Sequence, residues 1–155
     1  MKQVIQSLSS GRIELADVPV GRPGEHQVLV QTRLSLISPG TERMLLEFGR
    51  AGLIGKARQQ PERLRAIFEK VRTDGAVATI EAVQRRLDEP LAPGYCNVGI
   101  ILETGSQARE FSPGDRVASN GPHAEIVRVS RNLCALVPEE VSDRAAVFTP
   151  LAAVA

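Results

Sequence analysis

The stretch that decides the fold is LAPGYCNVGIILETG, residues 91–105, which closes a charged region and opens an apolar run. Pro93 and Gly94 are typical turn residues, and residues 97–104 have the apolar, β-branched composition of a strand. Three further strand-like segments follow, each bounded by Gly, Pro, Asn or Ser: GDRVAS, AEIVRVS and NLCALV. The chain after residue 93 is therefore predicted to form a β-domain.

The first 36 residues also have the pattern of strands. KQVIQSL and RIELADVPV alternate between apolar and polar residues, and the intervening SSG is typical of a hairpin turn. QVLVQTRLSLI predicts one long strand. Because side chains alternate between the two faces of a strand, Val28 and Val30 are expected on one face, with Leu29 and Gln31 on the other.

Residues 41–90 have a helical pattern instead, so we predict that a helical insert interrupts the β-domain. Pro61 suits a first helical turn, and a second helix is expected over residues 76–87. The apolar residues after Pro61 recur at helical spacing: Leu64, Ile67, Phe68 and Val71. Such an insert could act as a lid or as an oligomer contact.

A last helix is predicted over residues 143–155. Ser142 has the side chain of an N-cap, and Pro150 must either kink this helix or start a new one. The final residues are apolar, and we expect Leu151, Ala152 and Val154 to be poorly ordered or buried by another chain.

The composition narrows the functional class. A chain of 155 residues with 43% hydrophobic and 24% charged residues is expected to be one globular domain. Its net charge of +1 and its 3% aromatic content argue against nucleic acid or an anionic membrane as the main partner. No apolar run has the length of a membrane span. The basic segment KARQQPERLRAIFEKVR could bind nucleic acid, but without interleaved aromatics it is better interpreted as a solvated helix face.

Cys96, Cys134 and His123 give no clear site. Cys96 and Cys134 lack metal-like or redox-like spacing, so we expect reduced thiols and a cytoplasmic protein, with Cys134 a small core residue. His123, in SNGPHAEIV, is expected to be a surface or structural residue. The sequence has neither a G-x-G-x-x-G nor a Walker pattern, so the chain by itself has no recognisable nucleotide site.

The order of several short motifs carries a resemblance to a known family. SPGTE, PGYCNVGIILETG, FSPGDRVAS and HAEIVRVSRNLCALVPEEVSDRAAVFTPLAA together resemble the GroES-like catalytic domain of the medium-chain dehydrogenase/reductase superfamily. The matching residues are Gly40, Thr41, Pro93, Gly94, Gly99, Gly105, residues 114–117, Ala124, Glu125, Val127, Pro138, Ser142, Ala145 and Ala146. The resemblance is greatest to a bacterial subgroup with a helical insert, sometimes fused to a Gfo/Idh/MocA-type oxidoreductase.

The resemblance implies a fold that is mainly β: a GroES-like, partly open β-barrel over residues 1–155, with the helical insert at 41–90. It also implies that residues 142–155 begin a linker helix to a Rossmann domain that holds NAD or NADP and is absent from this chain. On this view the chain alone is inactive. Its expected partners are that Rossmann domain and a small-molecule substrate, with a homo-oligomer as a further option.

The resemblance further implies that a catalytic zinc has been lost. The family's three ligand positions correspond here to Pro39, Tyr95 and Thr149, none of which offers an imidazole, thiolate or carboxylate. Tyr95 would then face the substrate carbonyl, where its O–H could donate a hydrogen bond in place of the metal. Thr41 corresponds to the family's proton-relay hydroxyl, and Glu42 keeps a carboxylate at the position of the motif's Asp.

Two questions stay open at this point. Tyr95 could be a packing residue with its hydroxyl at the rim rather than a catalytic group. The chain could also be a non-catalytic binding or scaffold module that uses the same barrel, because fold does not determine function. The long helical insert disfavours a co-chaperonin, which is shorter and carries a mobile loop there.

Overall fold

A computed structural model describes residues 1–50, 85 and 89–154 of the chain. The chain divides into two compact units. The first comprises Met1–Val4, Leu15–Ser38 and Ala92–Ala155, and the second comprises Ile5–Glu14 and Pro39–Leu91. The main sheet and the C-terminal helices belong to the first unit, while helix α1 belongs to the second.

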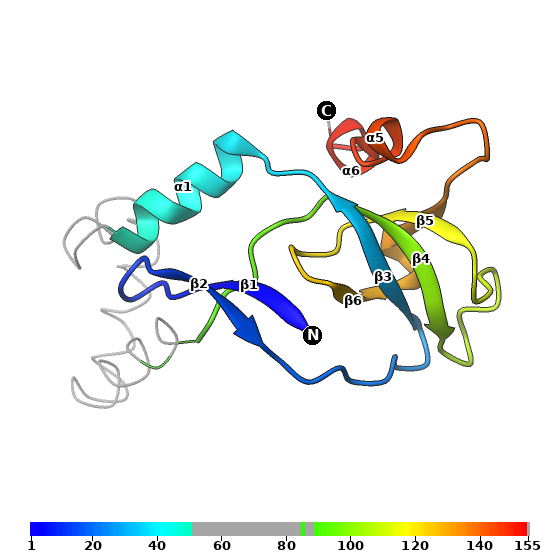
Figure 1. Cartoon of the computed structure of the whole chain (residues 1–155), viewed down its shortest axis with the longest axis horizontal. Helices are drawn as coiled ribbons and strands as arrows, with labels where there is room; N and C mark the ends of the chain where they lie inside the picture. Colours follow the sequence, from blue (N-terminus) through cyan, green and yellow to red (C-terminus); the bar gives the residue numbers. More distant parts are fainter. Residues whose placement is uncertain (51–84, 86–88, 155) are drawn as a thin grey trace, which may run out of the picture. The chain divides into compact units, whose positions relative to one another are not determined.

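The first unit is built on a five-stranded antiparallel sheet with the strand order β6-β3-β4-β5-β7 (Figure 1). Its strands are β3 (Gln27–Ser35), β4 (Asn97–Thr104), β5 (Arg116–Ser119), β6 (Ile126–Ser130) and β7 (Cys134–Leu136), the last preceded by the short 3-10 helix η1 (Arg131–Leu133). The strands predicted from alternation and turn residues are confirmed. The sheet has β6 and β7 at its edges, so closure into a barrel stays a prediction.

The core of this unit is aliphatic, as the scarcity of aromatic residues requires. Val28 and Val30 are fully buried, which confirms their predicted common face. They form a cluster with Ile101, Ala108, Phe111, Val117, Val127 and Val129. Each Val or Ile buried in this way contributes about 1.5–3 kcal/mol to folding. Leu29, on the opposite face, is also almost fully buried at 8% exposure.

Gly99 allows β3 and β4 to approach each other closely. It lies opposite Thr32, and the register between the two strands shifts between Thr32 and Leu34. A Cβ added at Gly99 would collide with the backbone oxygen of Gln31 and with Val30. Only glycine fits at this position, so the glycine of the PGYCNVG motif has a packing role.

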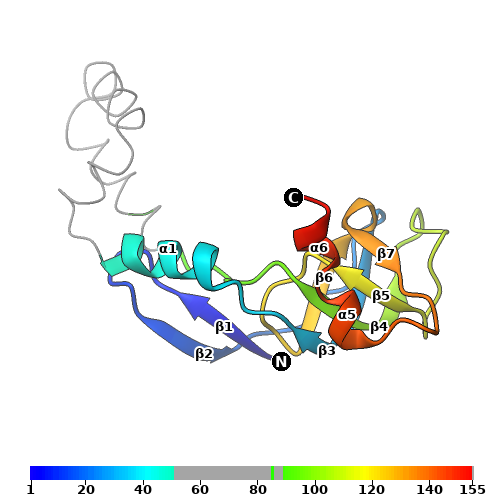
Figure 2. The same cartoon turned by 90° about the horizontal axis from the view of Figure 1, so that it is seen from above.

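The first two strands form a sheet of their own. β1 (Lys2–Gln6) and β2 (Ile13–Asp17) are joined by a turn in which Gly11 has a φ of 69°, as predicted for a hairpin (Figure 2). We expected these strands to share one sheet with the others, and this is wrong. A single bridge, from Gln3 to Ala124, joins the hairpin to residues next to β6. Ile13 and Leu15 are 46% and 62% exposed, so the alternation of β2 does not bury an apolar face.

Helix α1 (Pro39–Arg50) opens the predicted insert, two residues earlier than expected. Pro39 occupies its first turn, Glu42 lies near its positive end and Arg50 near its negative end, all of which favour a helix. Within the second unit, the buried Gln6 donates from Nε2 to the Leu45 oxygen at 2.9 Å. The helices predicted after Pro61 and over 76–87 lie outside the described residues.

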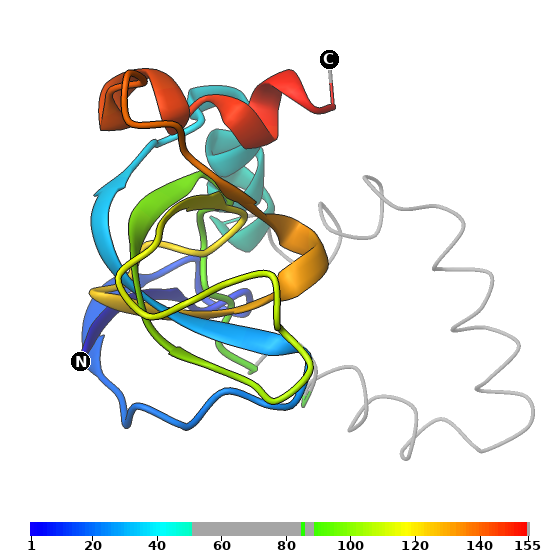
Figure 3. The same cartoon turned by 90° about the vertical axis from the view of Figure 1, so that its right-hand side faces the viewer.

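The C-terminal segment contains two short helices, α5 (Asp143–Ala146) and α6 (Thr149–Ala152). Ser142 caps α5 by accepting from the Ala145 N–H, as predicted, and Pro150 starts α6 rather than continuing α5. Figures 1 and 3 show both helices at one end of the five-stranded sheet. Ala146 and Val147 pack there in a second cluster with Cys96, Val98 and Ala118.

The exposure of the last residues differs along the segment. Leu151, expected to need another chain, is half-buried against the second cluster of its own chain. Phe148 and Val154 are 51% and 81% exposed. None of the helices in the described ranges has the length and apolar character needed to cross a bilayer.

Candidate functional site

Tyr95 lies on the turn between Pro93 and β4. Its half-buried ring packs against the second core cluster, and its hydroxyl donates to Ser38 Oγ at 2.9 Å. Ser38 lies three residues after the end of β3, and in between the Leu36 N–H donates to the Cys96 oxygen at 2.9 Å, which holds the two segments together. The phenol is therefore fixed by packing on its ring and by a hydrogen bond at its tip.

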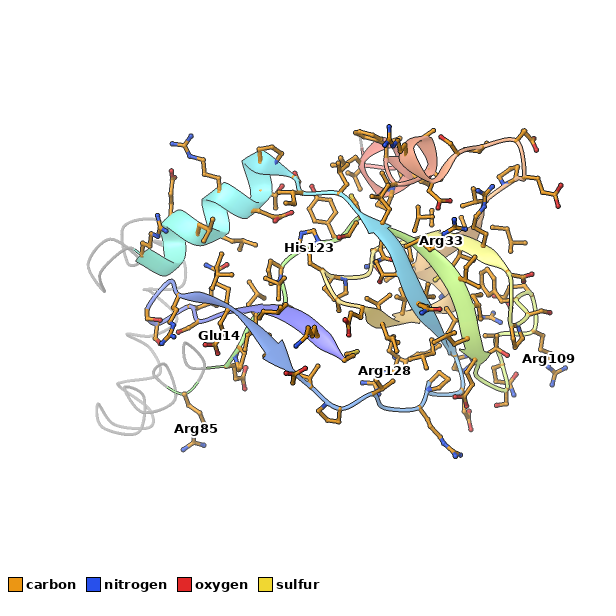
Figure 4. All side chains as sticks on the ribbon, in the orientation of Figure 1. Glu14, Arg33, Arg85, Arg109, His123 and Arg128 are labelled. Atoms are coloured by element: carbon orange, nitrogen blue, oxygen red, sulfur yellow. The ribbon has the colours of Figure 1, made fainter. Side chains whose placement is uncertain are left out.

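His123 is packed against the same turn from the loop before β6 (Figure 4). Its backbone N–H donates to the Pro93 oxygen at 2.9 Å, and its Nδ1 lies 2.9 Å from Ser35 Oγ. Gly94 has a φ of +97°, and a Cβ there would come within 2.8 Å of His123. The imidazole thus occupies the space that a side chain at position 94 would need.

These contacts define a hydroxyl–imidazole group made of Ser35, Ser38, Tyr95 and His123. Of these four residues, the sequence predicted only Tyr95 as a site residue and interpreted His123 as a surface or structural residue. His123 and Ser35 are 88 residues apart, so no local pattern could have linked them. The one sequence signal for this contact was Gly94 itself, because a glycine in a turn leaves room for another side chain to pack against the backbone.

Asn97 is a further polar residue that sequence analysis missed. It is fully buried at the start of β4, and its Nδ2 donates to Thr32 Oγ1 at 2.8 Å. Its Oδ1 is buried with no hydrogen-bond partner among the described residues. An unsatisfied buried carbonyl costs about 1–3 kcal/mol, so Asn97 lowers the stability of the fold by an amount of this order.

Thr41 and Glu42, the other two predicted site residues, lie in the first turn of α1. Thr41 is exposed and Glu42 is half-buried. Both belong to the second compact unit, whereas Tyr95 and its partner Ser38 belong to the first. Their joint action with Tyr95 therefore stays a prediction.

The side chains present do not match a catalytic zinc. Such a site needs three converging ligands of the imidazole, thiolate or carboxylate type. Among residues 1–50, 85 and 89–154, no three His, Cys, Asp or Glu side chains converge in this way. Of the positions that correspond to the family's ligands, Tyr95 donates its O–H to Ser38, and Pro39 has no donor atom.

The side chains likewise do not fit a dinucleotide. The sequence has no glycine-rich turn between a strand and a helix that could hold a pyrophosphate. The helices α5 and α6 have four residues each. No step involving the cofactor can be derived from this chain's own residues.

Comparison with known proteins places the fold. No family model matches the chain, and no curated protein sequence matches it. Among solved structures it is similar to the quinone oxidoreductase from Coxiella burnetii, with a TM-score of 0.62 and 18% identity, covering 95% of this chain and 40% of that one. It is also similar to the Escherichia coli quinone oxidoreductase complexed with NADPH, with a TM-score of 0.63 and 11% identity, covering 96% and 37%.

The fold is also similar to that of a dehydrogenase. Galactitol-1-phosphate dehydrogenase from Escherichia coli matches with a TM-score of 0.63 and 16% identity, covering 96% of this chain and 41% of that one. In these three cases the chain spans 37% to 41% of the similar protein. The chain therefore shares the β-rich fold of part of each of these three proteins.

Proposed function

We propose that this chain is the substrate-binding and catalytic part of an NAD(P)-dependent, zinc-independent oxidoreductase. It acts on a carbonyl or alcohol, or on an activated alkene, together with a Rossmann domain. The support is a fold shared with part of quinone oxidoreductases, one of them complexed with NADPH, and a half-buried phenol held in place by Ser38.

The observation that carries the proposal is the position of the Tyr95 hydroxyl. It is half-buried, its ring is packed, and Ser38 fixes its direction at 2.9 Å. A prealigned O–H in a partly desolvated place stabilises negative charge better than water does. Bound NAD(P)H would supply a hydride to the substrate carbon. The single Tyr95 O–H donates to Ser38 in this structure, so on substrate binding it would turn to the substrate oxygen, where negative charge develops, while the Ser38 hydroxyl donates to the phenol oxygen.

Thr41 and Glu42, in the first turn of α1, are proposed to take part in the same reaction. The Thr41 hydroxyl would relay a proton between the substrate oxygen and solvent, and the Glu42 carboxylate would accept from donors nearby. Phenol and hydroxyl groups can perform this acid–base work without a metal. Zinc independence is thus a consequence of the proposed donor set.

The test compares two proteins: the isolated chain, and a longer protein in which a dinucleotide-binding domain follows residue 155. Oxidation of NADH and NADPH is measured against a panel of quinones, aldehydes and ketones, with and without a strong chelator. We expect turnover only in the longer protein and no effect of the chelator. Loss of turnover on chelation would refute zinc independence. Turnover by neither protein with any acceptor would favour the binding-module alternative.

A further inference from the structure

The first compact unit contains a cavity that shares no residue with the hydroxyl–imidazole group. It has a volume of about 280 Å³, which corresponds to about nine water molecules. The linker between β2 and β3, residues 18–21, forms one wall, and the outer faces of β3 and β6 form another. Every residue that lines it belongs to the same unit, so its shape is defined within that unit.

Most of the side chains that line the cavity are apolar, although its exposed surface is slightly more polar than apolar. Leu29 from β3 and Ile126 from β6 meet Val18, Pro19 and Val20 from the linker. Val20 remains 44% exposed, whereas Leu29 is only 8% exposed. An apolar ligand group entering the cavity would cover Val20 and gain about 25 cal/mol for each square ångström of apolar surface removed from water.

Arg128 gives the cavity a positive charge. It is the direct cross-strand neighbour of Leu29, so the two side chains extend from the same face of the sheet. Its hydrogen bond to the Arg22 oxygen is long, at 3.5 Å, and no carboxylate pairs with it in the described part of the chain. The Met1 amino group, which donates to the Val18 oxygen at 3.0 Å, also borders the cavity.

No acidic side chain balances this charge inside the cavity. The described residues that line it include neither Asp nor Glu. Glu103 lies on the far side of Leu29, opposite it on β4. It is therefore two strands, or roughly 10 Å, from Arg128, about one Debye length at ordinary ionic strength. A guanidinium beside apolar side chains, with two parallel N–H donors, is suited to a carboxylate.

We propose that this cavity binds a small organic anion, namely a carboxylate joined to a short aliphatic body. The carboxylate lies against Arg128, and the aliphatic part packs between Leu29 and Val20. This site is independent of the proposed oxidoreductase activity, because its lining residues include none of the residues assigned to that activity.

The probe is hexanoate, titrated into the isotopically labelled chain while backbone amide NMR shifts are recorded. Saturable shifts are expected at residues 18–21, at Leu29 and at residues 126–128, with a dissociation constant of about 1 mM. The neutral isostere hexanamide should bind at least about tenfold more weakly, because it cannot form the charged pair with Arg128.

Two variants separate a specific site from general charge attraction. Arg128→Gln should weaken hexanoate binding at least about tenfold. Arg109→Gln removes an exposed cation from the loop after β4 (Figure 4) and should leave binding unchanged. Equal losses in the two variants, equal binding of hexanamide and hexanoate, or no saturable shifts up to about 10 mM hexanoate would each overturn the proposal.

Discussion

At the scale of single residues, Gly94 connects backbone conformation to the candidate site. Its φ of +97° turns the chain toward Tyr95, and its missing side chain leaves room for His123. Gly114 has a similar φ of +95°, but a Cβ there would meet nothing within 4 Å. The two glycines thus share the same backbone requirement and differ only in their surroundings.

This difference gives a matched pair of variants. Gly114→Ala should cost about 1 kcal/mol, which is the strain of a positive φ in alanine. Gly94→Ala should cost about 1–3 kcal/mol more, because its Cβ collides with His123. Urea unfolding measures both values. Tyr95 is the only tyrosine and the chain has no tryptophan, so its fluorescence reports on the Gly94 turn. Equal costs for the two variants would show that His123 does not pack there.

Cys134 makes stability depend on alkaline pH. Burial raises the pKa of its thiol from 9.0 to about 11. Between these values the unfolded chain loses the proton while the folded chain keeps it, so the unfolded state binds fewer protons and stability falls as pH rises. The stability of the protein relative to its Cys134→Ala variant should therefore decline from pH 9 to pH 11. A difference that stays constant over this range would contradict the raised pKa.

At the scale of elements, Asp143 ties the C-terminal helices to the sheet. It is the first residue of α5, and its carboxylate contacts Arg116 Nη1 on β5 at 3.1 Å and Arg33 Nε on β3 at 3.2 Å. The Asp143 and Arg116 side chains are only 19% and 22% exposed. One carboxylate therefore links three elements in a partly desolvated place, where such pairs are stronger than at the surface.

Asp143→Ala should destabilise the chain by about 1–3 kcal/mol, because it leaves two guanidinium groups without their shared acceptor. Glu140→Ala is the control: it removes an exposed carboxylate three residues earlier and should change stability by less than about 0.5 kcal/mol. Urea unfolding of both variants decides the question. A loss in Asp143→Ala no larger than in the control would show that the network is not stabilising.

Local sequence patterns predicted where the strands and helices lie better than they predicted which strands pair with each other. Strands β3 to β7 follow from alternation between turn residues, and the caps of α5 follow from Ser142. The sequence did not predict that β1 and β2 would form a sheet of their own, because alternation specifies a strand and not its neighbour. The sequence also left open whether Pro150 kinks the last helix or starts a new one. In both cases the backbone avoids the helical hydrogen bond that proline, lacking an N–H, cannot donate.

The same limit applies to the candidate site. Tyr95 could be singled out because it stands where a family motif has a metal ligand. Ser38 and His123 could not, because their positions depend on packing between segments far apart in the sequence. The unsatisfied Oδ1 of Asn97 is likewise a property of the folded chain alone.

At the scale of the whole molecule, the chain corresponds to 37% to 41% of the three oxidoreductases compared. The chain therefore matches less than half of each of those proteins. If the proposed function is correct, chemistry requires both this chain and a Rossmann domain, so the isolated chain should bind NADPH weakly. Fluorescence titration of NADPH should give a dissociation constant above about 1 mM for the chain alone. Binding in the micromolar range would contradict the division of roles between the two parts.

The most direct test is Tyr95→Phe in the longer protein that includes the dinucleotide-binding domain. The substitution keeps the ring and removes only the hydroxyl, so folding and NADPH affinity should not change. We predict that the rate of hydride transfer in a single turnover falls about 100-fold or more, because the developing negative charge loses its prealigned donor. An unchanged rate would contradict the catalytic role of Tyr95 and leave it as a packing residue.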